Sequence, residues 1–238
     1  MKALRLLSVL LLGFTLAARG DGISYSPFAN GGNIPDGDVM GWFDTATASG
    51  FAGAITDVSV TLDLAGSFNG DLYAYLSHNS VVVPLLNRVG VTGTGGGNAF
   101  GYADTGFNIT LSSSGANDVH FYGNHSPNFN GNGQLTGTWQ PDGRDIEPLS
   151  SPESFDLSSF SRVSFDLYDD MSPNGDWELF IADLGSGGVQ SQLLNWQLYI
   201  QAVPEPGSVA LGVFAGAFFV VAGRCRAAWL RRRFPKAP

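Results

Sequence analysis

The strongest constraint on the fold is an alternation of apolar and polar residues that recurs along the chain. In residues 57–64, Val and Leu occupy every second position, and Asp, Ser and Thr occupy the positions between them. A period of two places these side chains on opposite faces of a β-strand, one buried and one in water. The apolar positions of the repeats are Val58, Val60, Leu62 and Leu64; Leu72, Ala74 and Leu76; Val163, Phe165 and Leu167; Trp177, Leu179 and Ile181; and Trp196, Leu198 and Ile200. The alternation predicts short strands with one wet face.

The composition predicts many turns between these strands. The chain has 32 glycines and 12 prolines among 238 residues, a share above the average of roughly 12 %. No helical period appears before Gly207, and the polar, glycine-rich segments 90–98 and 117–137 are expected to be surface loops. Short strands joined by turns, each with one wet face, favour an all-β fold, an antiparallel β-sandwich of jelly-roll type.

Residues 1–20 have the layout of a secretory signal peptide. Lys2 and Arg5 precede an apolar stretch over residues 6–18, and small residues follow. We expect cleavage near Ala18 or Gly20, so that the exported body begins at residue 21. If this segment instead stays as an N-terminal anchor, the body still lies outside the cytoplasm.

A second apolar segment, residues 207–223, predicts a C-terminal transmembrane helix. Its 17 residues span roughly 26 Å as a helix, close to the hydrocarbon core of about 30 Å. The basic residues that flank it all lie in its C-terminal extension, residues 224–238. This asymmetry places that end in the cytoplasm and the preceding body outside. We therefore expect an exported chain that is attached to the inner membrane, at least transiently.

The residues around this helix resemble a bacterial PEP-CTERM sorting signal. The motif consists of Val203, Pro204, Glu205 and Pro206 before the helix and Arg231, Arg232 and Arg233 after it. The resemblance covers residues 203–238 and implies processing by an exosortase-type protease in a bacterium that makes exopolysaccharide. Processing leaves the body either in the membrane or released to the cell surface or matrix. The alternative is a stiff proline-containing linker before an ordinary membrane anchor.

The body between these ends, residues 21–202, reads as one strongly acidic domain. All 21 acidic residues lie within residues 21–205, where only three arginines oppose them, for a formal charge of −18. Such a surface repels phosphate backbones, so we expect no nucleic-acid partner. The single cysteine, Cys225, lies beyond the predicted helix, so no disulfide joins the body. Core burial, oligomerisation or bound metal must hold it together.

Three segments of the body resemble the P domain (P/Homo B domain) of subtilisin-like proprotein convertases. They are residues 34–36 (IPD), 70–78 (GDLYAYLSH) and 175–183 (GDWELFIAD), the last answered by residues 194–198 (LNWQL). The resemblance implies a β-sandwich of jelly-roll type over most of the body. In the convertases this domain assists a separate protease domain, for which this chain has no room.

The sequence has no recognisable catalytic motif. No G-x-S-x-G elbow, H-E-x-x-H zinc helix, phosphate-binding loop or dinucleotide fingerprint occurs. The histidines, His78, His120 and His125, lack the spacing of metal ligands, and structural or solvated roles are expected for them. We therefore expect that the chain is not an enzyme by itself.

An acidic turn at residues 169–176 is a candidate calcium site. It packs oxygen ligands into a short segment, and an aspartate from another loop would help to complete the coordination of about six to eight oxygens that Ca²⁺ takes. An EF-hand does not fit, because its position twelve is Ile181 on a predicted core strand. The alternative is a solvated turn whose Asp side chains cap their own backbone. The candidate ligands are Asp169, Asp170, Asn174, Asp176 and Asp71.

Aromatic side chains at wet or loop positions are candidate glycan contacts. They are Tyr73, Tyr75 and Trp139, with Tyr122 as a fourth, and the alternative is that they pack beneath long loops. Together these features predict an exported bacterial surface or extracellular-matrix protein with a structural or adhesive role. The alternatives are an accessory P domain that acts with a serine endopeptidase in trans, or a calcium- or glycan-binding module.

Overall fold

The computed structural model describes residues 21–25, 31–66, 68–94, 98–156 and 162–204. These residues belong to one compact unit, Gly20–Glu205. The predicted signal peptide and the predicted helix over residues 207–223 lie outside the described residues. Within those residues, no helix is long and apolar enough to cross a membrane.

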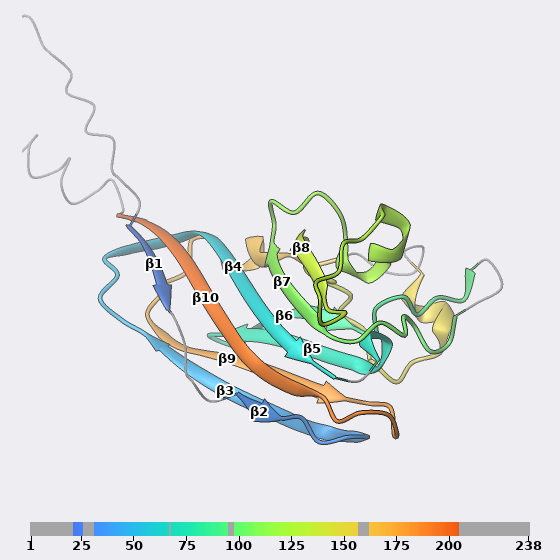
Figure 1. The fold of residues 1–238 in the computed structure, drawn as a ribbon. Helices are drawn as coiled ribbons and strands as arrows, with labels where there is room; N and C mark the ends of the chain where they lie inside the picture. The colour runs from blue at the N-terminus through green and yellow to red at the C-terminus, as the bar shows by residue number, and fades with distance from the viewer. Residues whose placement is uncertain (1–20, 26–30, 67, 95–97, 157–161, 205–238) are drawn as a thin grey trace, which may run out of the picture. The chain divides into compact units, whose positions relative to one another are not determined.

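The described residues form two β-sheets (Figure 1). The first contains β1 (Asp21–Tyr25), β2 (Gly32–Asn33), β4 (Gly53–Ala65), β7 (Phe107–Ser112), β8 (Leu135–Trp139) and β10 (Gln192–Pro204). Its order is β1-β10-β4-β7-β8, with β2 also paired to β10. The second contains β3 (Asp38–Ala48), β5 (Leu72–His78), β6 (Val81–Asn87) and β9 (Gly175–Asp183), in the order β3-β9-β5-β6. This arrangement confirms the predicted all-β sandwich. Its pairings are antiparallel except that β7 and β8 run parallel.

The alternation positions the core between the sheets. On β4, Val58, Val60, Leu62 and Leu64 are at most 1 % exposed. Trp177 on β9 and Trp196 on β10 are among the largest fully buried side chains and belong to one apolar cluster with them. The period-two prediction is thus confirmed for β4, β5, β9 and β10. Each of these strands buries one face and leaves the other for water or for binding.

The segment from Val163 to Leu167 was the exception, because it forms the 3-10 helix η5 (Phe165–Tyr168) instead of the predicted strand. The Ser164 hydroxyl accepts the Asp166 backbone N–H at 3.3 Å, which caps the first turn. Phe165 and Tyr168, three residues apart, are buried, whereas Leu167 is 47 % exposed. A repeat of three residues matches the 3-10 helix.

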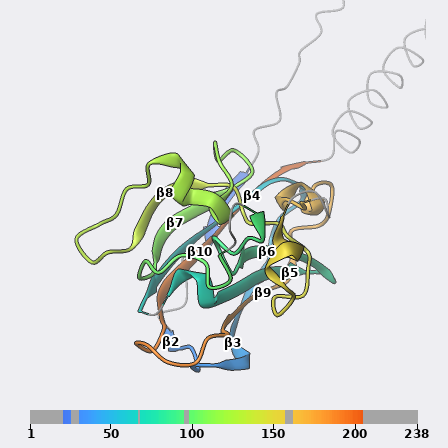
Figure 2. The ribbon, with the colours of Figure 1, turned by 90° about the vertical axis from the view of Figure 1, so that its right-hand side faces the viewer.

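The remaining helices of the described residues are also 3-10 helices. They are η1 (Asn69–Asp71), η3 (Val119–His125) and η4 (Pro152–Phe155). The segment 117–137, predicted as a surface loop, contains η3 and the start of β8. β8 lies beside β7, with which it pairs (Figure 2). Of the loop predicted at 90–98, residues 95–97 lie outside the described part.

The two predicted junctions of the body lie at the same end of the first sheet. Asp21, where the predicted signal peptide stops, pairs with Ala202 near the end of β10. The strand continues past the predicted domain boundary at residue 202, because Val203 pairs with Ala54 and Pro204 with Gly53. The sorting motif therefore begins inside the sheet without a linker before it.

Candidate functional site

Four aromatic side chains gather on the outer face of the β3-β9-β5-β6 sheet, and we name them the aromatic row. Phe43 lies on β3, Phe180 on β9, and Tyr73 and Tyr75 on β5. Phe180 pairs in register with Phe43 on one side and Tyr75 on the other. The rings of Tyr75 and Phe180 stack with their centroids 4.8 Å apart and their planes 14° apart. Phe43 is 64 % exposed, so this end of the row is open to a ligand.

The strand pattern explains why these rings point outward. Phe180 lies between the buried Leu179 and Ile181, so the alternation turns it to the other face. Gly41 on β3 leaves room for it, since a Cβ there would lie 2.9 Å from the ring tip of Phe180. Tyr73 meets both neighbouring rings edge-on, with centroids 6.0 Å from Tyr75 and 6.3 Å from Phe180.

Carboxylates border the aromatic row. Burial raises the pKa of Tyr73 to about 12, and Tyr75, Asp145 and Glu147 act in the same direction. Burial also raises the pKa of Tyr75, to which Glu178 adds its charge and a hydrogen bond. Both phenols are therefore protonated at neutral pH. Flat ring faces beside hydroxyl and carboxylate groups can stack against a sugar ring and hydrogen-bond its hydroxyls.

The structure separates the other two predicted glycan contacts from this row. Trp139 ends β8 in the opposite sheet and is only 7 % exposed, with its indole N–H donating to the Thr136 carbonyl at 3.0 Å. Tyr122 is 1 % exposed and donates to Asp104 at 2.7 Å. Their rings contact each other. The prediction that Trp139 is a surface contact was therefore wrong, because its ring packs in the apolar core.

Protein groups already engage the candidate calcium turn at 169–176. The ring nitrogens of His78 lie 2.8 Å from the carbonyl oxygens of Ser172 and Asp176. Asn174 accepts the Phe51 backbone N–H at 3.0 Å and donates to the Phe51 carbonyl at 2.9 Å. Thr47 donates to the Asp176 carboxylate at 2.7 Å. These contacts fix the turn through side chains and backbone.

The candidate ligands do not converge on one point. Asp169 and Asp170 are exposed, and the Asp170 N–H donates to the Ile55 carbonyl at 3.0 Å. Asp71 lies beside Asp183, at the other end of β9. Asp183 is seven residues from Asp176 on β9, which corresponds to about 24 Å along a strand, so Asp71 lies far from Asp176. No group of three or more His, Cys, Asp or Glu side chains suited to a metal occurs among the described residues.

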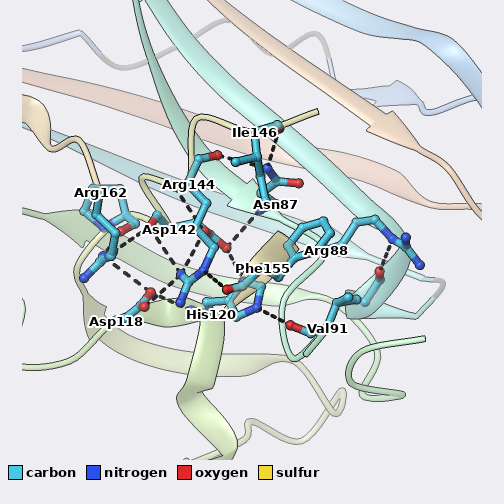
Figure 3. Close-up of polar contacts among 12 residues, drawn as sticks. Asn87, Arg88, Val91, Asp118, His120, Asp142, Arg144, Ile146, Phe155 and Arg162 are labelled. Carbon is cyan, nitrogen blue, oxygen red and sulfur yellow. Dashed lines mark hydrogen bonds and ion pairs between the residues drawn. The ribbon is translucent and has the colours of Figure 1, made fainter. Parts of the chain in front are cut away.

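A buried ionic network ties together the connections beside β6 and η3 (Figure 3). Arg144 is 0 % exposed, and its Nη1 lies 2.9 Å from Asp118 and 3.0 Å from Asp142. His120, also 0 % exposed, places its Nδ1 2.7 Å from Asp142 and its Nε2 2.8 Å from the Val91 carbonyl. Asp142 is fully buried, which by itself would raise its pKa, but His120 and Arg144 lower that pKa.

This network is structural in its geometry. Both ring nitrogens of His120 have oxygen partners and the ring is sealed from solvent, so the pair with Asp142 has no access to a substrate. The prediction of a structural role is confirmed for His120 and for the buried His78, while His125 is exposed. This network and the apolar core are the interactions that hold the body together in place of disulfides.

Of the sorting motif, only Val203 and Pro204 are described, as the last residues of β10. Glu205, Pro206, Arg231, Arg232 and Arg233 lie outside the described residues. Sequence reasoning missed Phe43 and Phe180, although an apolar residue at a wet position of an alternating strand was the available signal. Comparison with protein-family models and with curated proteins found no match to the chain. Both family resemblances therefore stay predictions, resting on the residues that carry them.

Proposed function

We propose that this chain is an exported bacterial surface or extracellular-matrix protein with a non-catalytic, P-domain-like sandwich of jelly-roll type. Its role is adhesive, and it holds a polysaccharide chain against the aromatic row. The PEP-CTERM-like tail, residues 203–238, sorts it to the membrane, where an exosortase-type protease processes it.

The aromatic row is the observation that carries the adhesive role. Phe43, Phe180 and Tyr75 follow one another across three neighbouring strands, which spans about 10 Å. A row of that length offers ring faces to more than one sugar of a chain. The acidic body repels polyanions, so a neutral polysaccharide fits this surface best.

Binding of the full-length chain to an insoluble neutral glucan tests this role. We expect wild type to be retained and Phe43→Ser and Tyr75→Ala to weaken retention by about tenfold, the equivalent of about 1.4 kcal/mol. Val82→Ser is the matched control, since Val82 is 43 % exposed on the adjacent strand β6 but lies outside the row. Failure of wild type to bind neutral glucans, including the host's own exopolysaccharide, would refute the adhesive role.

A separate experiment tests the sorting signal. The residues Pro204, Glu205 and Pro206 are replaced by alanine, and the mass and location of an internally tagged chain are compared with those of wild type. We expect the variant to keep the unprocessed mass and stay in the inner membrane. Equal masses and locations for the two chains would identify the tail as a plain anchor.

A further inference from the structure

A cavity of about 650 Å³ opens at the end of the sandwich where β5 and β10 begin and β9 ends. It lies near Gln192, the first residue of β10. Pro204, the last residue of that strand, is about 40 Å away along the strand. The connections before β5, after β6 and between β9 and β10 supply the walls of the cavity. Its lining includes Phe68, Asp71, Phe100, Tyr102, Gly185 and Gly187.

Two aromatic rings are exposed at this cavity, and hydrogen bonds hold the backbone on either side of one of them. Phe68 is 44 % exposed and Phe100 is 79 % exposed. Arg88 donates to the Ala99 carbonyl at 2.9 Å, and the Asn98 side chain donates to the Gly101 carbonyl at 2.9 Å, on either side of Phe100. The exposure of Phe100 therefore belongs to a held conformation, in which the ring is offered to a ligand.

The Asp71 carboxylate lines the same cavity as these rings. Gly185 packs directly on Asp71, since a Cβ at Gly185 would lie 2.4 Å from the carboxyl carbon. Burial raises the pKa of Asp71, the charges of Asp183 and Asp36 add to this, and Arg88 opposes it. The Arg88 guanidinium donates to carbonyl oxygens of the same loops. A cation in the cavity would relieve the repulsion among these aspartates.

An apolar depression of about 390 Å³ adjoins the cavity and shares Phe68 and Gly188 with it. Val189, which is 72 % exposed, and Leu194, which is 45 % exposed, line it. Exposed apolar side chains that gather beside a charged cavity are typical of an interaction surface. The two hollows together favour a partner with a charged group next to a bulky apolar one.

We propose that the cavity binds a basic side chain of a partner peptide, held between Phe68 and Phe100 and paired with Asp71, while a neighbouring apolar side chain fills the adjoining depression. Aromatic faces attract guanidinium and ammonium groups, and a carboxylate completes the site with charge-assisted hydrogen bonds. The residues that line this site include none of the aromatic row. The site gives the protein a second attachment, to protein rather than to polysaccharide.

Calorimetric titration of the full-length chain, purified in a mild detergent, tests the proposal. The probes are Nα-acetyl-Phe-Arg-amide and Nα-acetyl-Phe-citrulline-amide, which differ in the charge of one side chain. We expect saturable binding of the arginine probe and at least about tenfold weaker binding of the citrulline probe, because each tenfold corresponds to about 1.4 kcal/mol.

Variants locate the binding. Asp71→Asn removes the charge, and Gly185→Ala places a methyl group against the carboxylate. Each variant should therefore bind the arginine probe about tenfold more weakly than wild type does. Gly131→Ala is the matched control, since a Cβ there meets nothing within 4 Å. Phe43→Ser, in the aromatic row, should leave the arginine probe unaffected, which separates this proposal from polysaccharide binding.

Several outcomes would overturn the proposal. They are no saturable binding of the arginine probe, equal affinity for both probes, or unchanged affinity in both cavity variants when their melting temperatures equal that of wild type. Tighter binding of glucosamine than of the arginine probe would instead assign the cavity to an amino sugar. If Asp71→Asn does not fold, Gly185→Ala and Phe100→Ser decide the matter.

Discussion

Replacing Asp142 by asparagine tests whether the ionic network stabilises the body. The Asp142 carboxylate accepts hydrogen bonds from the Asn87 N–H at 3.1 Å, from His120 Nδ1 at 2.7 Å and from Arg144 Nη1 at 3.0 Å. Asparagine has nearly the same shape but only one acceptor oxygen. It would leave the buried Arg144 charge without this partner and point an amide N–H₂ at a group that now donates to the carboxylate.

The expected loss is large because every partner is buried. Removing one member of a buried ion pair typically costs about 3–5 kcal/mol. For a unit of this size, 1 kcal/mol corresponds to about 2–4 °C in melting temperature, so we expect a drop of about 6–20 °C. An exposed carboxylate would show less than about 0.5 kcal/mol.

Thermal and urea unfolding of the full-length chain, followed by tryptophan fluorescence, measures this loss. Asp145→Asn is the matched control, because Asp145 lies three residues further in the same connection and is exposed. If Asp142→Asn unfolds within 2 °C of Asp145→Asn, a limit that corresponds to about 0.5–1 kcal/mol, the network does not stabilise the fold and its burial is incidental.

Three further predictions concern the same body. The pKa of Asp142 is lowered in the folded state, so its stabilisation is complete above the unfolded value of about 3.9 and is lost as pH falls through the folded pKa; unfolding at a series of pH values should show the gap to Asp142→Asn closing only on the acid side. Asn174→Ala should cost about 1–3 kcal/mol in urea unfolding, because it leaves the Phe51 N–H and carbonyl without their partner; a neutral result would show that the turn is held without Asn174. Trp196→Phe should cost about 1–3 kcal/mol, since the indole N–H donates to Asp44 at 2.9 Å; Asp44→Asn, which retains an acceptor, should cost less.

The alternation was enough to predict the core strands because burial on one face is a local property. Leu62 and Trp196 pair across β4 and β10, and each belongs to an alternating pattern that indicates a buried face within its own segment. Phe165 shows where the rule fails. A short apolar alternation also fits a turn with buried residues three apart, and only the Ser164 cap distinguishes the two.

The candidate site divides along the same line. The outward direction of Tyr73 and Tyr75 follows from strand periodicity. The burial of Trp139 depends on contacts with η3, which the sequence pattern of β8 does not indicate. The ionic network was beyond sequence reasoning. Its members, such as Asn87 and Asp142, are 55 residues apart, and nothing in either segment marks the other as its partner.

The placement of the three arginines of the body leads to a last prediction. Arg144 belongs to the buried network, Arg162 lies at its edge with its side chain 23 % exposed and 3.4 Å from Asp118, and Arg88 donates to loop carbonyls. Asp118 and Asp142 make their ion pairs with His120, Arg144 and Arg162 inside that network. The acidic residues of the body far outnumber its arginines, and the resulting net negative charge destabilises the compact state by self-repulsion.

Salt should separate the two kinds of charge. Raising NaCl from about 0.01 M to about 1 M shortens the Debye length from about 30 Å to about 3 Å, which screens exposed charges far more than buried ones. We expect the wild-type melting temperature to rise with salt while its gap to Asp142→Asn stays constant. A gap that closes with salt would mean that solvent reaches the network. The surface, and not the interior, then carries the excess charge that makes this protein sensitive to its ionic surroundings.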